Sequence, residues 1–294
     1  MYHKSVLLKE SVDALDIEHR RDGTFVDVTF GGGGHSREIL QRLGPQGRLI
    51  VFDQDQEALA NVPDDKRILP VRSNFRFLEN QIRYLGIGRV DGIIADLGVS
   101  SHQFDTAERG FSYRFSSALD MRMNQASSTT AADIVSTYSK EDLARMLNDF
   151  GEVEGAMKVA SAICSFREKA PGKRIETTTQ LTQALERFFN AQSERKFLGK
   201  VFQALRIEVN QEMRALEDML QGSLQVLSDG GRLSVITYHS LEDRIVKNFM
   251  RSGKADGNFE ILLKKPLLPT EEEIQANGRS RSAKLRLASR TRKD

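Results

Sequence analysis

Residues Thr24 to Ser36 read TFVDVTFGGGGHS, a short apolar run that enters four consecutive glycines just before a predicted helix. Glycines let the backbone come close to a ligand, and the start of a helix offers unpaired N–H groups with positive potential. Asp53 ends the next predicted strand, twenty positions after Gly33, where a carboxylate can accept hydrogen bonds from a ribose diol. The glycine loop and Asp53 together favour a binding site for an adenosine-type ligand. The alternative is a tight structural turn with an incidental surface Asp.

The first hundred residues or so alternate β-rich runs with amphipathic stretches, which is typical of βαβ units that feed a mostly parallel sheet. The predicted strands in this part are 24–30, 48–53, 68–74 and 90–98, and the predicted helices are 36–43, 56–62 and 75–85. Later strands are expected at 231–238, at 259–265 and near 283–289. The pattern predicts an α/β protein with a doubly wound, Rossmann-like sheet of seven strands and a late hairpin.

The alternation stops after Asp96, and no convincing strand follows until Gly231. Between them the chain is polar and helical in pattern, with Ser139 and Asp142 forming a capping box. We therefore predict a helical domain at 106–199, inserted between sheet segments 1–105 and 200–294. One long helix is expected to carry the apolar stripe from Phe202 to Leu227 back into the sheet.

The composition narrows the class of protein. The 294 residues include 43 Lys and Arg against 41 Asp and Glu, a formal net charge of +2, and 39% are hydrophobic. This balance excludes a disordered chain and a highly cationic nucleic-acid coat. No apolar stretch approaches the roughly 20 residues of a membrane helix, and no signal peptide is recognisable. Cys164 is the only cysteine, so we expect no intramolecular disulfide, no membrane association and a cytoplasmic location.

Neither a metal site nor a nucleophilic triad is expected. The five histidines lack close ligand spacing, and one cysteine cannot form a zinc cluster. No G-x-S-x-G motif is present.

The segment from Arg279 to Asp294 holds seven basic residues and a single acid. Charge alone leaves two interpretations open for this basic C-terminal tail. It either grips a polyanion or forms a solvated terminal arm.

Several chemically active side chains follow predicted strands. Asp96 lies at the carboxyl end of the fourth strand, where it can hold the amino group of a cofactor, accept a proton from a substrate or cap a turn. Phe75 follows the third strand and belongs either against an adenine face or in the core. Tyr238 and His239 follow the fifth strand and border the same crevice, although His239 equally suits the cap of the next helix.

The glycine loop departs from the dinucleotide fingerprint G-x-G-x-x-G. Ser36, or His35 in the other alignment, stands where the third glycine of that fingerprint would lie. S-adenosylmethionine has no pyrophosphate to cradle and does not demand the pattern. The loop thus favours this cofactor over NAD without deciding between them.

Eight segments together resemble the bacterial RsmH (MraW) family of small-subunit ribosomal RNA methyltransferases. They are HKSVLLKE from His3, DVTFGGGGHS from Asp27, DLGVSS from Asp96, ERGFS from Glu108, LDMRM from Leu119, FQALRIEVNQE from Phe202, GGRLSVITYHSLEDRIVK from Gly230 and RSRSAKLR from Arg279. The resemblance covers essentially the whole chain. It implies a class I S-adenosylmethionine-dependent methyltransferase fold with an inserted helical domain for substrate recognition.

The resemblance also implies an activity, a cofactor and a partner. The enzyme would methylate the exocyclic N4 of one cytidine in the decoding region of 16S rRNA, within the small ribosomal subunit. The implied contacts to S-adenosylmethionine are Gly33, Gly34, His35, Asp53, Phe75, Asp96 and Gln103.

Methyl transfer to an amino group needs an acceptor for the amino proton, and the candidates are Asp96, Asp120, Tyr238 and His239. Candidates for contact with RNA phosphates are the basic tail and Arg109, Arg114, Arg167, Lys169, Lys173 and Arg174. The alternatives are a nicotinamide-dependent oxidoreductase and a non-catalytic RNA-binding assembly factor. A homodimer stays open.

Overall fold

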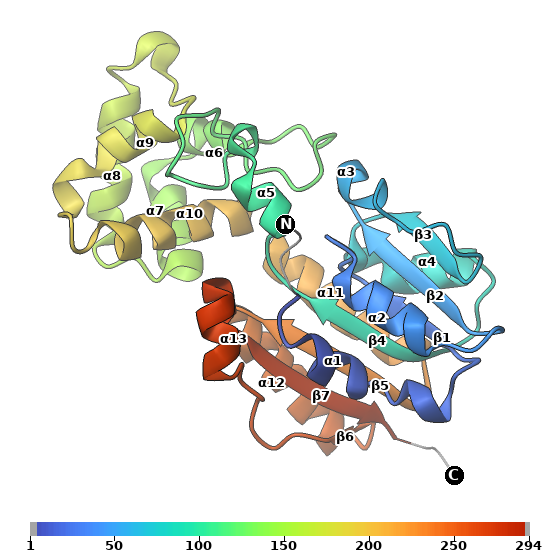
Figure 1. Cartoon of the computed structure of the whole chain (residues 1–294). Coiled ribbons are helices and arrows are strands. Elements are labelled where there is room, and N and C mark those ends of the chain that lie inside the picture. The colour runs from blue at the N-terminus through green and yellow to red at the C-terminus, as the bar shows by residue number, and fades with distance from the viewer. Residues whose placement is uncertain (1–4, 292–294) are drawn as a thin grey trace. The chain divides into compact units, whose positions relative to one another are not determined.

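The computed structural model describes residues 5–291, and the chain divides into two compact units (Figure 1). The first unit comprises the residues up to Gly98 together with those from Met213 onward, and the second comprises Val99–Glu212. The HKSVLLKE segment begins at His3, so its first two residues, His3 and Lys4, lie outside the described residues, as do Arg292 and Lys293 of the basic tail.

The first unit contains one seven-stranded sheet in the order β3-β2-β1-β4-β5-β7-β6. Its strands are β1 (Thr24–Asp27), β2 (Arg48–Asp53), β3 (Ile68–Arg72), β4 (Val90–Asp96), β5 (Leu227–Thr237), β6 (Phe259–Ile261) and β7 (Lys284–Arg290). The five strands from β3 to β5 run parallel, whereas β7 is antiparallel to both β5 and β6. All seven strands predicted from the sequence are present, and the class I fold is confirmed.

Helices cover both faces of this sheet. They are α1 (Leu8–Asp13), α2 (Gly34–Arg42), α3 (Gln56–Leu59), α4 (Leu78–Tyr84), α11 (Glu212–Val226), α12 (Ser240–Ala255) and α13 (Glu271–Ala276). Because side chains alternate along a strand, Val26 and Ile93 pack on one face with α4, α11 and α12, and Phe25 and Ile94 pack on the other with α1 and α2. Polar residues lie at the carboxyl ends of several strands, beyond these apolar layers.

The second unit is a helical domain with its own core. Its helices are α5 (Ser101–Asp105), α6 (Ala131–Thr137), α7 (Lys140–Gly151), α8 (Ala156–Arg167), α9 (Thr178–Leu185) and α10 (Glu194–Asn210). Ser139 caps α7 by accepting a hydrogen bond from the Asp142 N–H, as its sequence pattern predicts. Leu143, Leu147 and Leu205 are fully buried in the core that these helices share.

The apolar stripe that predicted one long helix is divided between two. Helix α10 ends at Asn210, Gln211 has a left-handed backbone with φ of 49°, and α11 begins at Glu212. The side chains before the break, such as Leu205, belong to the core of the second unit, and those after it, such as Leu216, belong to the sheet core. The prediction of a single helix was therefore wrong.

The bounds of the helical unit also differ from the predicted bounds of the inserted domain, which ended the first sheet segment at 105 and the insertion at 199. Phe104 of α5 and Leu198 and Val201 of α10 pack in the helical core, so both flanking helices belong to the second unit. Their apolar contacts, which sequence composition does not reveal, extend the unit to residues 99–212.

The basic segment near the C-terminus is a strand of the sheet and not a free arm. Residues 284–290 form β7, which pairs with β5 on one side and β6 on the other. The Arg286 guanidinium donates to both carboxylate oxygens of Asp243, at 2.6 and 3.1 Å. The interpretation of the tail as a solvated terminal arm was wrong for these residues, because sequence charge does not show which basic groups have partners in the fold. Contact of the tail with a polyanion stays a prediction.

Candidate active site

The carboxyl ends of the parallel strands meet where the strand order reverses, between β1 and β4. In open α/β sheets this switch point forms the crevice in which ligands bind. Asp27 ends β1, Asp53 ends β2 and Asp96 ends β4, so three carboxylates lie along this edge. Tyr238 follows the end of β5, the strand next to β4.

The glycine loop joins β1 to α2 through a left-handed turn. Gly33 has φ of 73° and is the N-cap of α2, and a Cβ at this position would lie 2.7 Å from the Phe30 ring. Gly31 also has a positive φ, and its N–H donates to Asp53 Oδ2 at 2.9 Å. A Cβ on Gly32 would meet nothing within 4 Å. Gly32 is therefore the position where the loop backbone is open to a ligand.

Gly34 and Phe75 lie close to other parts of the first unit, unlike Gly32. A Cβ on Gly34 would lie 2.0 Å from the Ser5 hydroxyl oxygen, so glycine allows the segment before α1 to approach. Phe75 is half-buried and packs against the sheet core, beside the N-cap residue Asn74. Its remaining exposure leaves part of the ring available, and both sequence interpretations of Phe75 still stand.

Asp53 connects β2 with the glycine loop. Besides the Gly31 N–H, it accepts the Asp55 N–H at 2.9 Å through its other oxygen. Burial raises the pKa of Asp53 to about 6, against the opposing effect of the two backbone hydrogen bonds. Each carboxylate oxygen has further acceptor capacity, which a ribose diol can use. The donor and acceptor chemistry therefore fits an adenosine-type cofactor.

Asp96 is the centre of a polar network at the end of β4. The Tyr238 hydroxyl donates to Asp96 Oδ1 at 2.7 Å, and His35 Nδ1 lies 3.7 Å from Oδ2. The Asp96 side chain is 24% exposed, so a partner can reach it. Burial raises the pKa of Asp96, against the effects of His35 and of the Tyr238 hydrogen bond, and the charges of Asp27 and Glu242 raise it further. A carboxylate of raised pKa is a stronger proton acceptor than an ordinary one.

The contacts of His35 and Tyr238 show which of their polar atoms donate hydrogen bonds. His35 is buried, and its Nε2 lies 3.2 Å from the Val6 carbonyl oxygen, which only accepts, so Nε2 carries a proton. Burial and the Asp96 carboxylate raise the pKa of Tyr238 well above its usual value. Tyr238 is thus a neutral donor.

His239 is the N-cap of α12. Its Nδ1 accepts the Glu242 N–H at 3.4 Å, and its Nε2 lies 3.1 Å from Glu242 Oε1. Glu242 in turn accepts the N–H groups of Tyr238 and His239. Of the two interpretations from sequence, the helix cap is confirmed.

Three further residues, whose roles the sequence analysis missed, tie the loop to β4. The Ser36 hydroxyl donates to Asp27 Oδ2 at 2.6 Å, and the Thr29 N–H donates to Asp27 Oδ1 at 3.0 Å. The Asp96 N–H donates to the Thr29 hydroxyl oxygen at 2.6 Å. Asp27 is buried, which raises its pKa. A buried Asp at a strand end, followed by Thr and then Ser, was the signal in DVTFGGGGHS.

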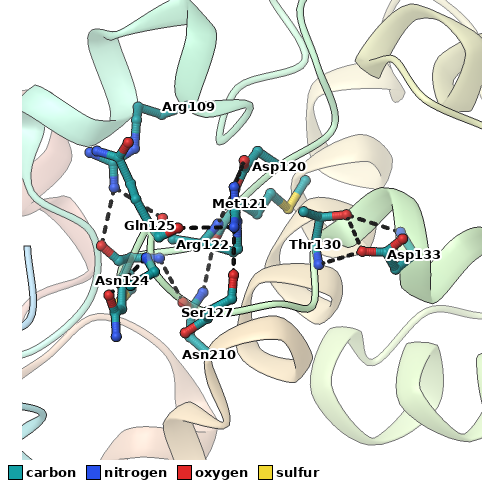
Figure 2. Close-up of polar contacts among 12 residues, drawn as sticks. Arg109, Asp120, Met121, Arg122, Asn124, Gln125, Ser127, Thr130, Asp133 and Asn210 are labelled. Atoms are coloured by element: carbon teal, nitrogen blue, oxygen red, sulfur yellow. Dashed lines mark hydrogen bonds and ion pairs between the residues drawn. The ribbon is translucent and has the colours of Figure 1, made fainter.

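Gln103 and Asp120 belong to the second unit. Gln103 closes a capping box with Ser100 at the start of α5. Asp120 accepts three hydrogen bonds from Arg122, from its backbone N–H at 2.9 Å and from its guanidinium at 2.8 and 2.6 Å (Figure 2). Burial acts to raise the pKa of Asp120, but the Arg122 contacts outweigh it, and the pKa is lowered.

Most of the basic side chains proposed from sequence to contact phosphate are engaged within the second unit. Arg109 is buried and donates to backbone carbonyls, Arg167 donates to the Val135 and Tyr138 carbonyls, Lys173 pairs with Glu168, and Arg174 pairs with Asp133. Arg114 is exposed, with its guanidinium 5.7 Å above the Phe104 ring, and Lys169 is exposed. Lys173 is also accessible to a polyanion, since its side chain is 73% exposed, so three of the six cations remain available.

Within the described part of the chain, His, Cys, Asp and Glu side chains form no group of three or more that could hold a metal ion. Among residues 5–291, no helix is long and apolar enough to cross a membrane.

The strand order, the glycine turn and the carboxylates at the ends of β2 and β4 define a class I methyltransferase architecture. The model of the MraW methylase family matches residues 1–291, and the chain belongs to this family. The nicotinamide-dependent oxidoreductase alternative is thereby set aside.

Named relatives cover nearly the whole length of the chain. Ribosomal RNA small subunit methyltransferase H of Bacteroides fragilis (strain YCH46) is 54% identical over 299 residues, which cover 98% of this chain and 97% of that protein. The protein of the same name from Flavobacterium johnsoniae is 49% identical over 298 residues, with the same coverage. Among solved structures, an rRNA methylase from Streptococcus thermophilus is 11% identical, covers 97% of this chain and 94% of that chain, and has a TM-score of 0.42.

Proposed function

We propose that this protein methylates the exocyclic N4 of one cytidine in the decoding region of 16S rRNA, with S-adenosylmethionine as the methyl donor. Membership of the MraW methylase family and the names of the relatives support the rRNA methyltransferase activity. The observation that carries the chemical part is the partly exposed, Tyr238-bound carboxylate of Asp96, at the switch point next to the glycine loop.

The cofactor-binding residues are proposed from the geometry of the first unit. Gly33 sets the turn, the open backbone of Gly32 admits the ligand, and Asp53 accepts hydrogen bonds from the ribose. We include Gly34, His35, Phe75 and Gln103 from the family resemblance. When bound, S-adenosylmethionine supplies a methyl group on a positively charged sulfur, which makes that carbon electrophilic.

Asp96 is proposed as the acceptor of the amino proton. The N4 lone pair of cytosine is delocalised into the ring, so the amino group becomes acidic only as the new N–C bond forms. A partly exposed carboxylate with raised pKa suits this task, and the Tyr238 hydroxyl fixes its orientation. The alternative role for Asp96 is to hold the amino group of the cofactor.

Asp120, Tyr238 and His239 receive supporting roles in this proposal. The Asp120 carboxylate has its pKa lowered by Arg122, so it is a weak base and maintains the shape of its loop. Tyr238 stays protonated and orients Asp96. His239 secures the start of α12.

The second unit is proposed to recognise the RNA. A cytidine in structured RNA has to leave its stack to reach such a pocket, which takes a few kcal/mol, so contacts away from the base must contribute to binding. We propose the small ribosomal subunit as the form of the substrate and the cytoplasm as the location. Light scattering distinguishes a monomer from the homodimer that the sequence left open.

Transfer of labelled methyl from S-adenosylmethionine tests this proposal. Small-subunit particles and free 16S rRNA serve as acceptors, and nucleoside mass spectrometry identifies the product. We expect N4-methylcytidine at a single site. A protein that only assists assembly would transfer no label to either acceptor.

Two variants separate the roles within the site. Asp53→Ala is expected to raise the Kd for S-adenosylmethionine, measured by calorimetry. Asp96→Asn is expected to lower kcat with an unchanged Kd if Asp96 accepts the proton. A raised Kd in Asp96→Asn would assign this carboxylate to the cofactor instead.

A further inference from the structure

Asn210, the last residue of α10, makes three hydrogen bonds through one side chain (Figure 2). Its Nδ2 donates to the Met121 carbonyl and to the Arg206 carbonyl, both at 2.8 Å. Its Oδ1 accepts the Met123 N–H, also at 2.8 Å. The side chain therefore joins the end of a helix to a loop that lies 87 to 89 positions earlier in the sequence.

The backbone is strained on both sides of this contact. Met121 has φ of 62° although it is fully buried, and Gln211 has φ of 49°. Residues with a Cβ adopt this left-handed region only where the surroundings enforce it, and such strain concentrates at functional sites. Asn210 bonds directly to Met121 and precedes Gln211, so it is the shared support of both.

Hydrogen bonds from two arginine side chains hold the same loop, residues 119–127. The buried guanidinium of Arg109 donates to the Arg122 carbonyl at 3.0 Å and to the Met123 carbonyl at 3.2 Å. Arg122 binds the Asp120 carboxylate and also donates to the Gln125 carbonyl at 3.0 Å. The inner side of the loop is thus held by hydrogen bonds along most of its length.

The outer side of the loop faces solvent. Residues 125–127 of the loop, Gln-Ala-Ser, and the adjoining Ser128 and Thr129 are all exposed, and they present one amide and three hydroxyl groups without any charge. Amide and hydroxyl groups bind ribose and phosphate oxygens as well as base edges. Such weak, directional contacts are useful only when the loop keeps one shape.

We propose that Asn210 is a positioning residue for RNA methylation, which holds the 119–127 loop in the conformation that binds the substrate RNA. This inference rests on the proposed function and adds to it a residue that touches neither the cofactor nor the methylated base. Asn210 is placed where the chain leaves the second unit, since Glu212 is the last residue of that unit. The loop and the end of α10 therefore act as one rigid part.

Steady-state methylation kinetics of Asn210→Ala test the proposal, with RNA and S-adenosylmethionine varied separately. The matched control is Asn190→Ala, four residues before α10 begins at Glu194. Asn190 Oδ1 accepts hydrogen bonds from the N–H groups of Gln192 and Ser193 and from the Ser193 hydroxyl. Both variants lose three contacts of an asparagine side chain, but only Asn210→Ala releases the loop.

We expect kcat/KM for RNA to fall about 10- to 100-fold in Asn210→Ala, the effect of a small misplacement of bound substrate. The Kd for S-adenosylmethionine should stay within twofold of the wild type, and Asn190→Ala should keep both values within twofold. RNA kinetics within twofold of wild type in folded Asn210→Ala overturn the proposal. An equal loss in Asn190→Ala at a similar unfolding midpoint also overturns it, since the effect would then be general destabilisation.

A stabilised background keeps the test valid if Asn210→Ala folds poorly. Gln211 is exposed, and Gln211→Gly removes the penalty of its left-handed backbone. The same measurements are then made on Gln211→Gly with and without Asn210→Ala. If the wild type transfers no methyl group to RNA, the proposed function itself fails, whereas an active wild type with an equally active Asn210→Ala refutes only the role of Asn210.

Discussion

The phenol of Tyr238 donates a 2.7 Å hydrogen bond to the carboxylate of Asp96. Asp96 ends β4, and Tyr238 directly follows the neighbouring parallel strand β5. Strand pairing thus sets the distance between them. The contact places a neutral donor against a carboxylate whose own pKa is raised by burial. It fixes the orientation of the carboxylate and leaves its second oxygen facing His35, at 3.7 Å.

Tyr238→Phe tests whether this hydrogen bond tunes Asp96. A hydrogen bond to a charged group contributes about 1.5–3 kcal/mol, and it favours the ionised carboxylate. Its removal should raise the pKa of Asp96, so the acid limb of the pH dependence of kcat should move to higher pH by about one unit. Tyr84→Phe, at an exposed position of the same unit, is the control. Superimposable acid limbs for wild type and Tyr238→Phe would contradict the assignment.

Asp53 makes the stability of the ligand-free protein depend on pH. Its pKa is about 6 in the fold and 3.8 in the unfolded chain, so the folded state binds the extra proton between these values. The favourable contribution is therefore complete below about pH 4 and is lost as the pH rises through 6, with an upper bound of about 3 kcal/mol. Urea unfolding between pH 4.5 and 7.5 should show a shallower pH dependence for Asp53→Asn. Equal slopes in the two proteins would exclude Asp53 as the titrating group.

Two neighbouring glycines should respond differently to alanine. Gly33→Ala forces a Cβ against the Phe30 ring and into a left-handed backbone, which should destabilise the protein by about 2 kcal/mol. Gly32→Ala meets no atom within 4 Å, so the free energy of unfolding should barely change. Because Gly32 is the open position of the loop, its variant should instead bind S-adenosylmethionine more weakly. Denaturation and calorimetry on both variants decide this, and a weakened Gly32→Ala fold with normal affinity would reverse the assignment.

Arg286→Ala should lower stability without weakening RNA binding. The side chains of Arg286 and Asp243 are 12% and 13% exposed, and loss of a hydrogen bond to a charged group destabilises a protein by about 1.5–3 kcal/mol. Burial acts to raise the pKa of Asp243, but Arg286 and Lys284 outweigh it and lower the pKa. The stability from this pair is thus present above about pH 4 and is lost as the pH falls through the lowered pKa. Thermal unfolding and filter binding of RNA measure the two effects, with exposed Arg281→Ala as the control. Loss of RNA affinity in Arg286→Ala alone, at temperatures where it is folded, would restore the tail as an RNA contact.

The sheet was predictable because its signals are local. Alternating apolar runs, bounded by turn residues, are enough to find all seven strands. The break at Gln211 was not predictable, because the apolar spacing continues through it and neither Gly nor Pro marks it. An apolar residue at every third or fourth position shows which side of a helix is apolar. It does not show that one residue has a left-handed φ that ends the helix.

The residues of the candidate site were predictable where they lie at strand ends. They were less predictable where a role depends on which side chain or carbonyl a residue contacts. Asp53 and Asp96 follow directly from the ends of parallel strands. Arg286 and Asp243 are 43 positions apart, and no short pattern connects them. Arg109 counts as a free cation in the sequence but binds backbone carbonyls in the fold. Contacts between residues that are far apart in the sequence determine the roles of such basic side chains, and a single sequence does not reveal these contacts.

The antiparallel position of β7 between β5 and β6 has a consequence for biosynthesis. During translation, β5 is complete some fifty residues before its outer neighbour emerges. Until then its unpaired edge remains available to strands of other nascent chains, which is a recognised route to aggregation. This edge of the sheet is therefore protected only once β7 has been made and has paired with β5.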